Sequence, residues 1–149
     1  MTTQVRRRAW THERQADGKD PEVAHEPHAI LAEDDFEMRQ LLAHALRMDG
    51  YRVTEVRDGS ELLDAMAGYL IRGKGGSLDL VVTDVRMPKI GGLEAIAGLR
   101  QCDWSTPVVV ITAFGDEETH AEARRLGAIA VFDKPFDLRA IRSSWRGLA

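Results

Sequence analysis

The chain of 149 residues contains a single cysteine, Cys102, so it has no internal disulfide framework, which is typical of proteins in a reducing compartment. It also lacks any apolar run that approaches the ~20 residues needed to span a membrane. Positive charge is not in excess: the formal net charge is −4 at pH 7, which argues against non-specific nucleic-acid binding. We therefore expect a soluble cytoplasmic protein with neither a membrane nor a nucleic acid as partner.

The first 28 residues differ in composition from the rest. They hold five acidic and five basic residues and almost no apolar periodicity, so the net charge of −4 belongs to residues 29–149. The three arginines at positions 6–8 are not followed by an apolar stretch, which argues against a secretory signal. We predict that residues 1–28 form a mobile extension and that residues 29–149 form one folded domain.

From residue 29 onward, short apolar runs alternate with amphipathic segments. The apolar runs predict five strands, at 29–32, 51–56, 78–83, 107–111 and 128–132. A helix is predicted after each strand. Because strands that alternate with helices pair in parallel through right-handed crossovers, the pattern predicts an α/β fold. The third strand is apolar on both faces and should be central in the sheet.

The apolar spacing also predicts which helix residues are buried. In the first helix these are Met38, Leu41, Leu42, Ala45 and Leu46. In the second they are Leu62, Leu63, Met66 and Leu70. In the last they are Leu138, Ile141 and Trp145. The third helix is placed at 92–100. The fourth, at 117–126, has only alanines and one leucine among charged residues, so we expect it to be lightly anchored.

Helix ends carry recognisable signals. Gly50 and Gly127 should end the first and fourth helices, because glycine adopts the left-handed conformation that terminates a helix. Ser60 is a suitable N-cap for the second helix. His44 and His120 lie among polar residues on predicted helices, and we expect both to be solvated.

A polar group stands at the carboxyl end of four of the predicted strands. Glu33 and Asp34 follow the first, Asp84 the third, Thr112 the fourth, and Lys134 comes shortly after the fifth. The carboxyl ends of parallel strands meet at one crevice, so these side chains should converge. Carboxylates, a hydroxyl and an ammonium together suit a divalent cation and a phosphoryl group.

These motifs, in this order, resemble the receiver domain of bacterial two-component response regulators. The resemblance rests on Glu33-Asp34-Asp35, on Asp84-x-x-Met87-Pro88 with Gly92, on Thr112-Ala113 and on Lys134-Pro135-Phe136. It covers residues 29 to about 148. It implies a flavodoxin-like three-layer sandwich with a five-stranded parallel sheet of order 2-1-3-4-5 and five helices. We expect a stand-alone module similar to chemotaxis regulators, with no output domain.

The resemblance also implies a role for each site residue. Asp84 would accept a phosphoryl group from a histidine kinase or a histidine phosphotransfer protein, with Mg²⁺ as cofactor. Asp34 would bind the metal directly, Glu33 more through water, and Asp84 and the backbone carbonyl of Arg86 would complete the set. Thr112 would be the switch hydroxyl. Lys134 would pair with the phosphate. Such a module is no enzyme for outside substrates, because it catalyses only its own phosphorylation and dephosphorylation.

The same chemistry predicts how the site behaves. Without metal, the carboxylates of Glu33, Asp34 and Asp84 repel one another, so at least one pKa should be raised. On phosphorylation Thr112 would move inward, and the helix at 117–126 would shift with its flanking loops. The downstream contact surface, and a homodimer interface, would then lie on that fourth helix, the fifth strand and the fifth helix.

One departure from the family pattern bears on this switch. The family usually has an aromatic residue three places before the lysine, where this chain has Val131. Phe132 is one place later, and strand alternation points it to the other face. The contact surface should therefore change through the helix at 117–126 alone. Phe114 stands two places after Thr112, and we hypothesise that it shields the phosphoryl group from water and slows self-hydrolysis.

Two rival functions are also compatible with these residues. The same carboxylates, lysine and Mg²⁺ could serve a phosphatase or phosphotransferase that acts on an external substrate. Alternatively, the chain could be a metal-independent scaffold whose acidic residues no longer bind a cation. An acidic run at a helix start can also act only as a cap that complements the helix dipole.

Overall fold

The computed structural model describes residues 26–72, 78–102, 104–113 and 115–148. Within these ranges the strands are β1 (His28–Ala32), β2 (Arg52–Val56), β3 (Leu80–Asp84), β4 (Val108–Thr112) and β5 (Ala130–Asp133). The helices are α2 (Phe36–Met48), α3 (Gly59–Arg72), α4 (Gly92–Arg100), α5 (Glu117–Arg125) and α6 (Leu138–Arg146). The predicted mobile extension lies outside the described residues apart from positions 26–28, and so does Phe114.

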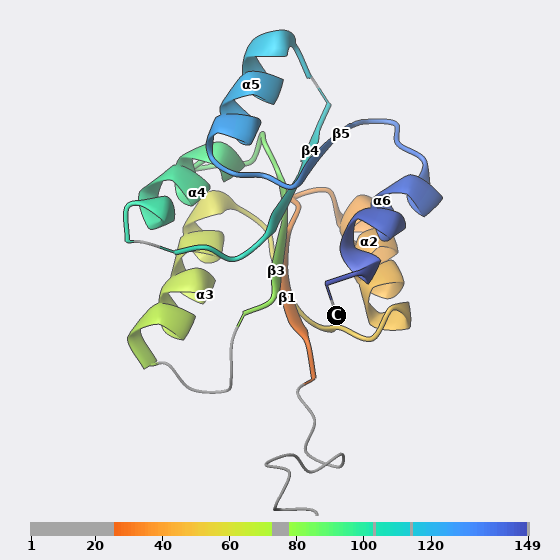
Figure 1. The fold of residues 1–149 in the computed structure, drawn as a ribbon, viewed down its shortest axis with the longest axis horizontal. Helices are drawn as coiled ribbons and strands as arrows, with labels where there is room; N and C mark the ends of the chain where they lie inside the picture. Colours follow the sequence, from red (N-terminus) through yellow and green to blue (C-terminus); the bar gives the residue numbers. More distant parts are fainter. Residues whose placement is uncertain (1–25, 73–77, 103, 114, 149) are drawn as a thin grey trace, which may run out of the picture.

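The strands form one parallel sheet in the order β2-β1-β3-β4-β5. Helices α3, α4 and α5 cover one face of the sheet, and α2 and α6 cover the other (Figure 1). The predicted α/β three-layer sandwich is therefore confirmed. In this topology the carboxyl ends of β1, β3, β4 and β5 lie along the same edge of the sheet, where the chain turns into the helices.

Each face of the sheet has its own hydrophobic core. The core under α3, α4 and α5 includes Ile30, Val81, Ile96, Val110 and Ala123. The core under α2 and α6 includes Leu31, Leu46, Val82, Ile111 and Trp145. All residues of β3 and β4 are buried, because both strands have neighbours on each side and helices above and below. The predicted central position of the third strand is thus confirmed.

Residues 131 and 132 lie on opposite faces of β5, as the strand alternation predicts. Val131 packs against the core under α3, α4 and α5, whereas Phe132 packs against the core under α2 and α6. The aromatic ring is therefore on the side of the sheet away from α5.

No helix in the described part of the chain is both long and apolar enough to cross a membrane.

Three local predictions were wrong. The predicted cap of α3 was Ser60, but the helix begins at Gly59. The Asp58 carboxylate caps it by accepting a hydrogen bond from the Glu61 N–H at 2.8 Å. Leu41 is 44% exposed and Leu70 is 42% exposed. The buried face of α2 runs instead through Arg39, because its guanidinium is drawn in to donate to the Glu33 carbonyl at 2.8 Å.

Helix ends and strand bounds agree better with prediction. Gly50 and Gly127 have φ values of 96° and 88° and follow the ends of α2 and α5, which confirms their predicted role. The strands differ from prediction by one or two residues. In particular, β3 and β4 extend to include Asp84 and Thr112, so these two residues are held by the sheet itself.

Candidate functional site

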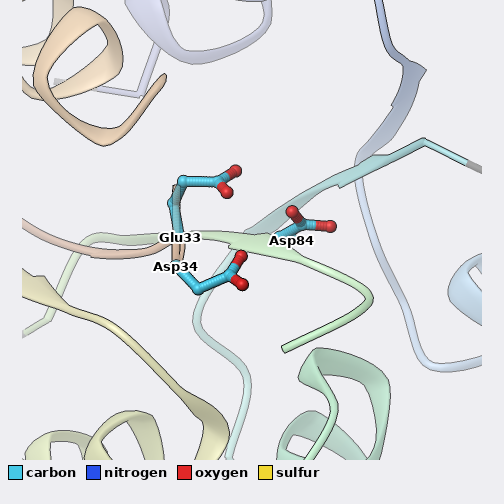
Figure 2. Close-up of side chains that lie close together, drawn as sticks. All are labelled: Glu33, Asp34 and Asp84. Atoms are coloured by element: carbon cyan, nitrogen blue, oxygen red, sulfur yellow. The ribbon is translucent and has the colours of Figure 1, made fainter. Parts of the chain in front are cut away.

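Three carboxylates converge at the end of the two adjacent strands β1 and β3. Glu33 and Asp34 come directly after β1, and Asp84 is the last residue of β3. One carboxylate oxygen from each of the three lies within 4.8 Å of the others, and Figure 2 shows the side chains grouped beside the strand end. Glu33 and Asp84 are buried while Asp34 is exposed. Oxygen donors at this spacing suit a hard divalent cation, so the residues fit a metal site.

The acidic run Glu33, Asp34 and Asp35 divides into two functions. The Asp35 carboxylate accepts a hydrogen bond from the Met38 N–H at 2.8 Å and caps α2. The Glu33 carboxylate faces the site and accepts from the Asp35 N–H at 3.0 Å. The backbone N–H of Glu33 donates to the Val56 carbonyl at 3.1 Å. Helix capping therefore accounts for one acid of the three, and the other two remain directed at the site.

Lys134 supplies the positive charge of the site. Its Nζ lies 2.7 Å from Asp84 Oδ2 and 3.1 Å from Glu33 Oε1. Its backbone N–H donates to the Thr112 carbonyl at 2.8 Å, which ties the residue after β5 to the end of β4. The ammonium thus bridges two of the three carboxylates and offsets their mutual repulsion.

Burial and charge shift the pKa values of two of these groups. Burial is the main reason that the pKa of Glu33 rises to about 7, and the negative charge of Asp84 raises it further. The expectation of a raised pKa is confirmed, although desolvation contributes more than the predicted repulsion. For Lys134, burial would lower the pKa, but hydrogen bonds and attraction from Asp84 and Glu33 outweigh it, so the pKa is raised. Lys134 is therefore charged near neutral pH.

Two further predicted residues are placed near this group. The Arg86 backbone N–H donates to Asp84 Oδ1 at 3.2 Å, so the β3–α4 loop already contacts the Asp84 carboxylate. Thr112 ends β4, the neighbour of β3, and is fully buried. The roles of the Arg86 carbonyl and of the Thr112 hydroxyl stay predictions.

One contact near the site was missed from the sequence. His120 Nε2 lies 2.9 Å from Asp133 Oδ1, so the prediction of a solvated His120 was wrong. Asp133 directly precedes Lys134, and the pair links α5 to the end of β5. No local sequence signal marks this contact, because the two residues are 13 positions apart and meet only when α5 packs beside β5.

Comparison with known families agrees with this geometry. The family described as "Response regulator receiver domain" matches residues 29–146. The chain belongs to this family. It is thus a receiver domain of two-component signalling, a signalling module and not a classical enzyme.

Individual relatives cover most of this receiver domain. Transcriptional regulatory protein CpxR of Escherichia coli K12 is 34% identical over 119 residues, which cover 80% of this chain and 47% of CpxR. Sporulation initiation phosphotransferase F of Bacillus subtilis is 28% identical over 115 residues, 77% of this chain and 87% of that protein. The chain spans about half the length of the curated relatives that it matches first.

A solved structure shows the same fold. The non-phosphorylated HemR receiver domain from Leptospira biflexa superposes with a TM-score of 0.69 at 28% sequence identity. The superposition covers 82% of this chain and 93% of that domain. The parallel sheet and its five flanking helices are thus the receiver arrangement.

Proposed function

We propose that this receiver domain accepts a phosphoryl group on Asp84 from a histidine kinase or a histidine phosphotransfer protein, in the presence of Mg²⁺. One observation carries the proposal: the Asp84 carboxylate lies 2.7 Å from the Lys134 ammonium and beside the carboxylates of Glu33 and Asp34. Phosphoryl transfer depends on positioning and charge neutralisation, and this group of side chains supplies both.

The chemistry of the donors supports Mg²⁺ as the cation. Asp34 and Asp84 would hold it directly with the Arg86 carbonyl, and Glu33 would act mainly through water. When bound, Mg²⁺ lowers the repulsion between the Asp84 carboxylate and the oxygens of the incoming phosphoryl group. Glu33 must lose its proton to act as an anionic partner, so Mg²⁺ affinity should rise as the pH increases through about 7.

The transfer itself requires little covalent chemistry from the protein. A carboxylate oxygen of Asp84 forms a bond to phosphorus while the bond between phosphorus and the donor imidazole nitrogen breaks. The electron pair of the broken bond stays on the imidazole nitrogen. Lys134 pairs with a phosphoryl oxygen, and its hydrogen bond to Asp84 Oδ2 holds the attacking carboxylate in place.

The signal would then pass to the surface through β4 and α5. Thr112 would hydrogen-bond the phosphoryl group, and the loop to α5 would shift with it. A change from about 1% to about 99% active requires that the phosphoryl group interact with the active conformation more favourably than with the inactive one by about 5.5 kcal/mol. The faces of α5, β5 and α6 would contact the downstream protein or a second copy of the chain. Phe114 would lengthen the lifetime of the phosphorylated state.

Two general features complete the proposal. We place the receiver domain at residues 29–149, with His28 as the first residue of its strand β1, and treat the residues before that strand as a separate extension. We also place the protein in the cytoplasm, where histidine kinases present their phosphorylated histidine.

The test is incubation with acetyl phosphate and Mg²⁺, followed by intact mass spectrometry. We expect the wild-type chain to gain one phosphoryl group, and we expect Asp84→Asn to gain none. Asp64→Asn, which removes an exposed carboxylate on α3, is the matched control and should be phosphorylated like the wild type. Labelling of Asp84→Asn at the wild-type level would refute the assignment.

The rival functions give different results in the same experiment. A phosphatase would release inorganic phosphate over many turnovers without a stable phosphoprotein. A metal-independent scaffold would show no gain in mass with or without Mg²⁺. A gain that needs Mg²⁺ and stops at one phosphoryl group per chain favours the receiver function over both.

A further inference from the structure

The β2–α3 corner, residues 56–59, contacts the two segments that form the walls of the acidic site. One wall is the segment after β1 that carries Glu33 and Asp34, and the other is the β3–α4 loop that follows Asp84. On one side the Val56 carbonyl accepts the Glu33 N–H at 3.1 Å, which holds the segment that carries Glu33 and Asp34. On the other side Gly59, the first residue of α3, lies against the β3–α4 loop at Ile90. None of these corner residues supplies a side chain to the site itself.

The contact at Gly59 leaves no room for a side chain. A Cβ atom at this position would lie 1.9 Å from the Ile90 carbonyl oxygen and 2.5 Å from its carbonyl carbon. Both are backbone atoms, so rotation of a side chain cannot relieve the clash. The β3–α4 loop and the start of α3 would have to move apart if residue 59 carried a methyl group.

A second contact joins the same two segments. Asp58 is buried, and its Oδ1 accepts the Glu61 N–H at 2.8 Å. Its Oδ2 lies 3.7 Å from Lys89 Nζ. Lys89 has a φ of 72°, a left-handed conformation that is unfavourable for a residue with a side chain. An ion pair therefore joins the start of α3 to the loop at the residue where the loop turns.

The far end of this loop reaches Asp84. The Arg86 N–H donates to Asp84 Oδ1 at 3.2 Å, and the Val85 N–H donates to the Ile111 carbonyl at 3.0 Å. The backbone that would present the Arg86 carbonyl to a metal is thus held at the sheet and, a few residues later, at the start of α3. A shift at Ile90 would be transmitted to the Asp84 carboxylate.

We propose that the β2–α3 corner sets the spacing between the two walls of the Mg²⁺ site, with Gly59 and Asp58 as positioning residues. The inference rests on the proposed function, because it concerns the same metal site. Mg²⁺ demands near-octahedral oxygen geometry and tolerates displaced ligands poorly. Changes to residues that orient metal ligands typically weaken binding by about 10- to 100-fold.

The test is Mg²⁺ affinity, measured by isothermal titration calorimetry without any phosphodonor. We expect Gly59→Ala to weaken Mg²⁺ binding about tenfold. Gly98→Ala is the matched control, because Gly98 lies in the α4 helix with open space around its Cβ position. It should bind Mg²⁺ like the wild type. Thermal unfolding without Mg²⁺ shows separately whether each variant is folded.

A second variant covers the case in which Gly59→Ala does not fold. Asp58→Asn keeps a capping side chain for α3, so the unfolding temperature should change little. It removes the charge that faces Lys89, and it should weaken Mg²⁺ binding about two- to threefold, because a partly exposed ion pair contributes little. If Gly59→Ala is folded and binds Mg²⁺ as tightly as the wild type, the inference is overturned. If Gly59→Ala is unfolded, wild-type Mg²⁺ affinity in Asp58→Asn overturns it. If the wild type itself binds no Mg²⁺, the proposed function fails instead.

Discussion

The helices α5 and α6 flank the edge strand β5 and have the same length of nine residues, yet they are held very differently. In α6 both Ile141 and Trp145 are fully buried. In α5, all of whose residues the structure describes, Ala123 alone is buried. Because burial of large apolar side chains is the main source of helix anchoring, α6 should be far more firmly attached than α5.

Polar contacts widen this difference. Asp49, at the end of α2, accepts hydrogen bonds from Trp145 Nε1 at 2.8 Å and Arg142 Nε at 3.0 Å. The Tyr51 hydroxyl donates to the Trp145 carbonyl at 2.8 Å. On α5, His120 pairs with Asp133, whose side chain is 54% exposed. We propose that α5 moves on phosphorylation, and α5 is the helix held by fewer buried side chains and fewer hydrogen bonds.

Trp145→Ala should produce the largest loss of stability. Removing a fully buried aromatic side chain costs about 3–5 kcal/mol of unfolding free energy, and here the hydrogen bond to Asp49 is lost as well. The measurement is urea unfolding followed by circular dichroism. The comparison variant is Arg124→Ala on α5, which should change stability by less than about 0.5 kcal/mol. Similar losses in both variants would contradict the contrast between the helices.

Asp49→Ala should cost less, about 2 kcal/mol, because it removes charge-assisted hydrogen bonds but little apolar contact. The Arg142 guanidinium is the main reason that the pKa of Asp49 lies well below its ordinary value of 3.8. A depressed pKa in the folded state stabilises the fold above the unfolded pKa, and this stabilisation is lost as the pH falls.

The stability difference between wild type and Asp49→Ala should therefore be full at neutral pH and shrink as the pH falls below about 4. Urea unfolding at a series of pH values measures it. Arg142→Ala should lose the same pH dependence in part, because Trp145 and Arg146 still contact Asp49. A difference that grows on acidification would exclude this explanation.

Amide hydrogen exchange compares the two helices directly in the unmodified chain. Local opening requires less energy where few apolar contacts break, so we expect the α5 amides to exchange at least about tenfold faster than those of α6. Peptides from the two helices can be followed by mass spectrometry in one experiment. Equal protection of α5 and α6 would show that Ala123 and the neighbouring loops anchor α5 more strongly than its burial indicates.

The smallest effect is expected for His120→Ala. A partly exposed hydrogen bond contributes about 1 kcal/mol, so the unfolding free energy should fall by no more than about that amount. Asp133→Asn should have a similar effect. The double variant should then add little, because both single changes break the same contact. A loss above about 2 kcal/mol would mean that this pair, and not apolar packing, anchors α5.

Much of this protein could be predicted from periodicity and chain order. Alternating apolar runs and amphipathic segments determined the strands, the helices and the parallel sheet, because these patterns depend on residues only a few positions apart. The polar residues at strand ends indicated one shared site, since parallel strands must end at the same edge. Strand alternation also placed Val131 and Phe132 on opposite faces.

Other features were decided only by packing between distant segments. Arg39 is buried because its guanidinium reaches the Glu33 carbonyl, which no helical pattern reveals. Leu41, which the pattern places on the buried face, is exposed. The Asp49–Trp145 bond joins residues 96 positions apart. Likewise, the raised pKa of Glu33 depends on desolvation by the assembled fold. Local sequence encodes backbone dihedral preferences and apolar periodicity. The distances between remote side chains, and the polarity of their surroundings, are set only when the helices pack on the sheet.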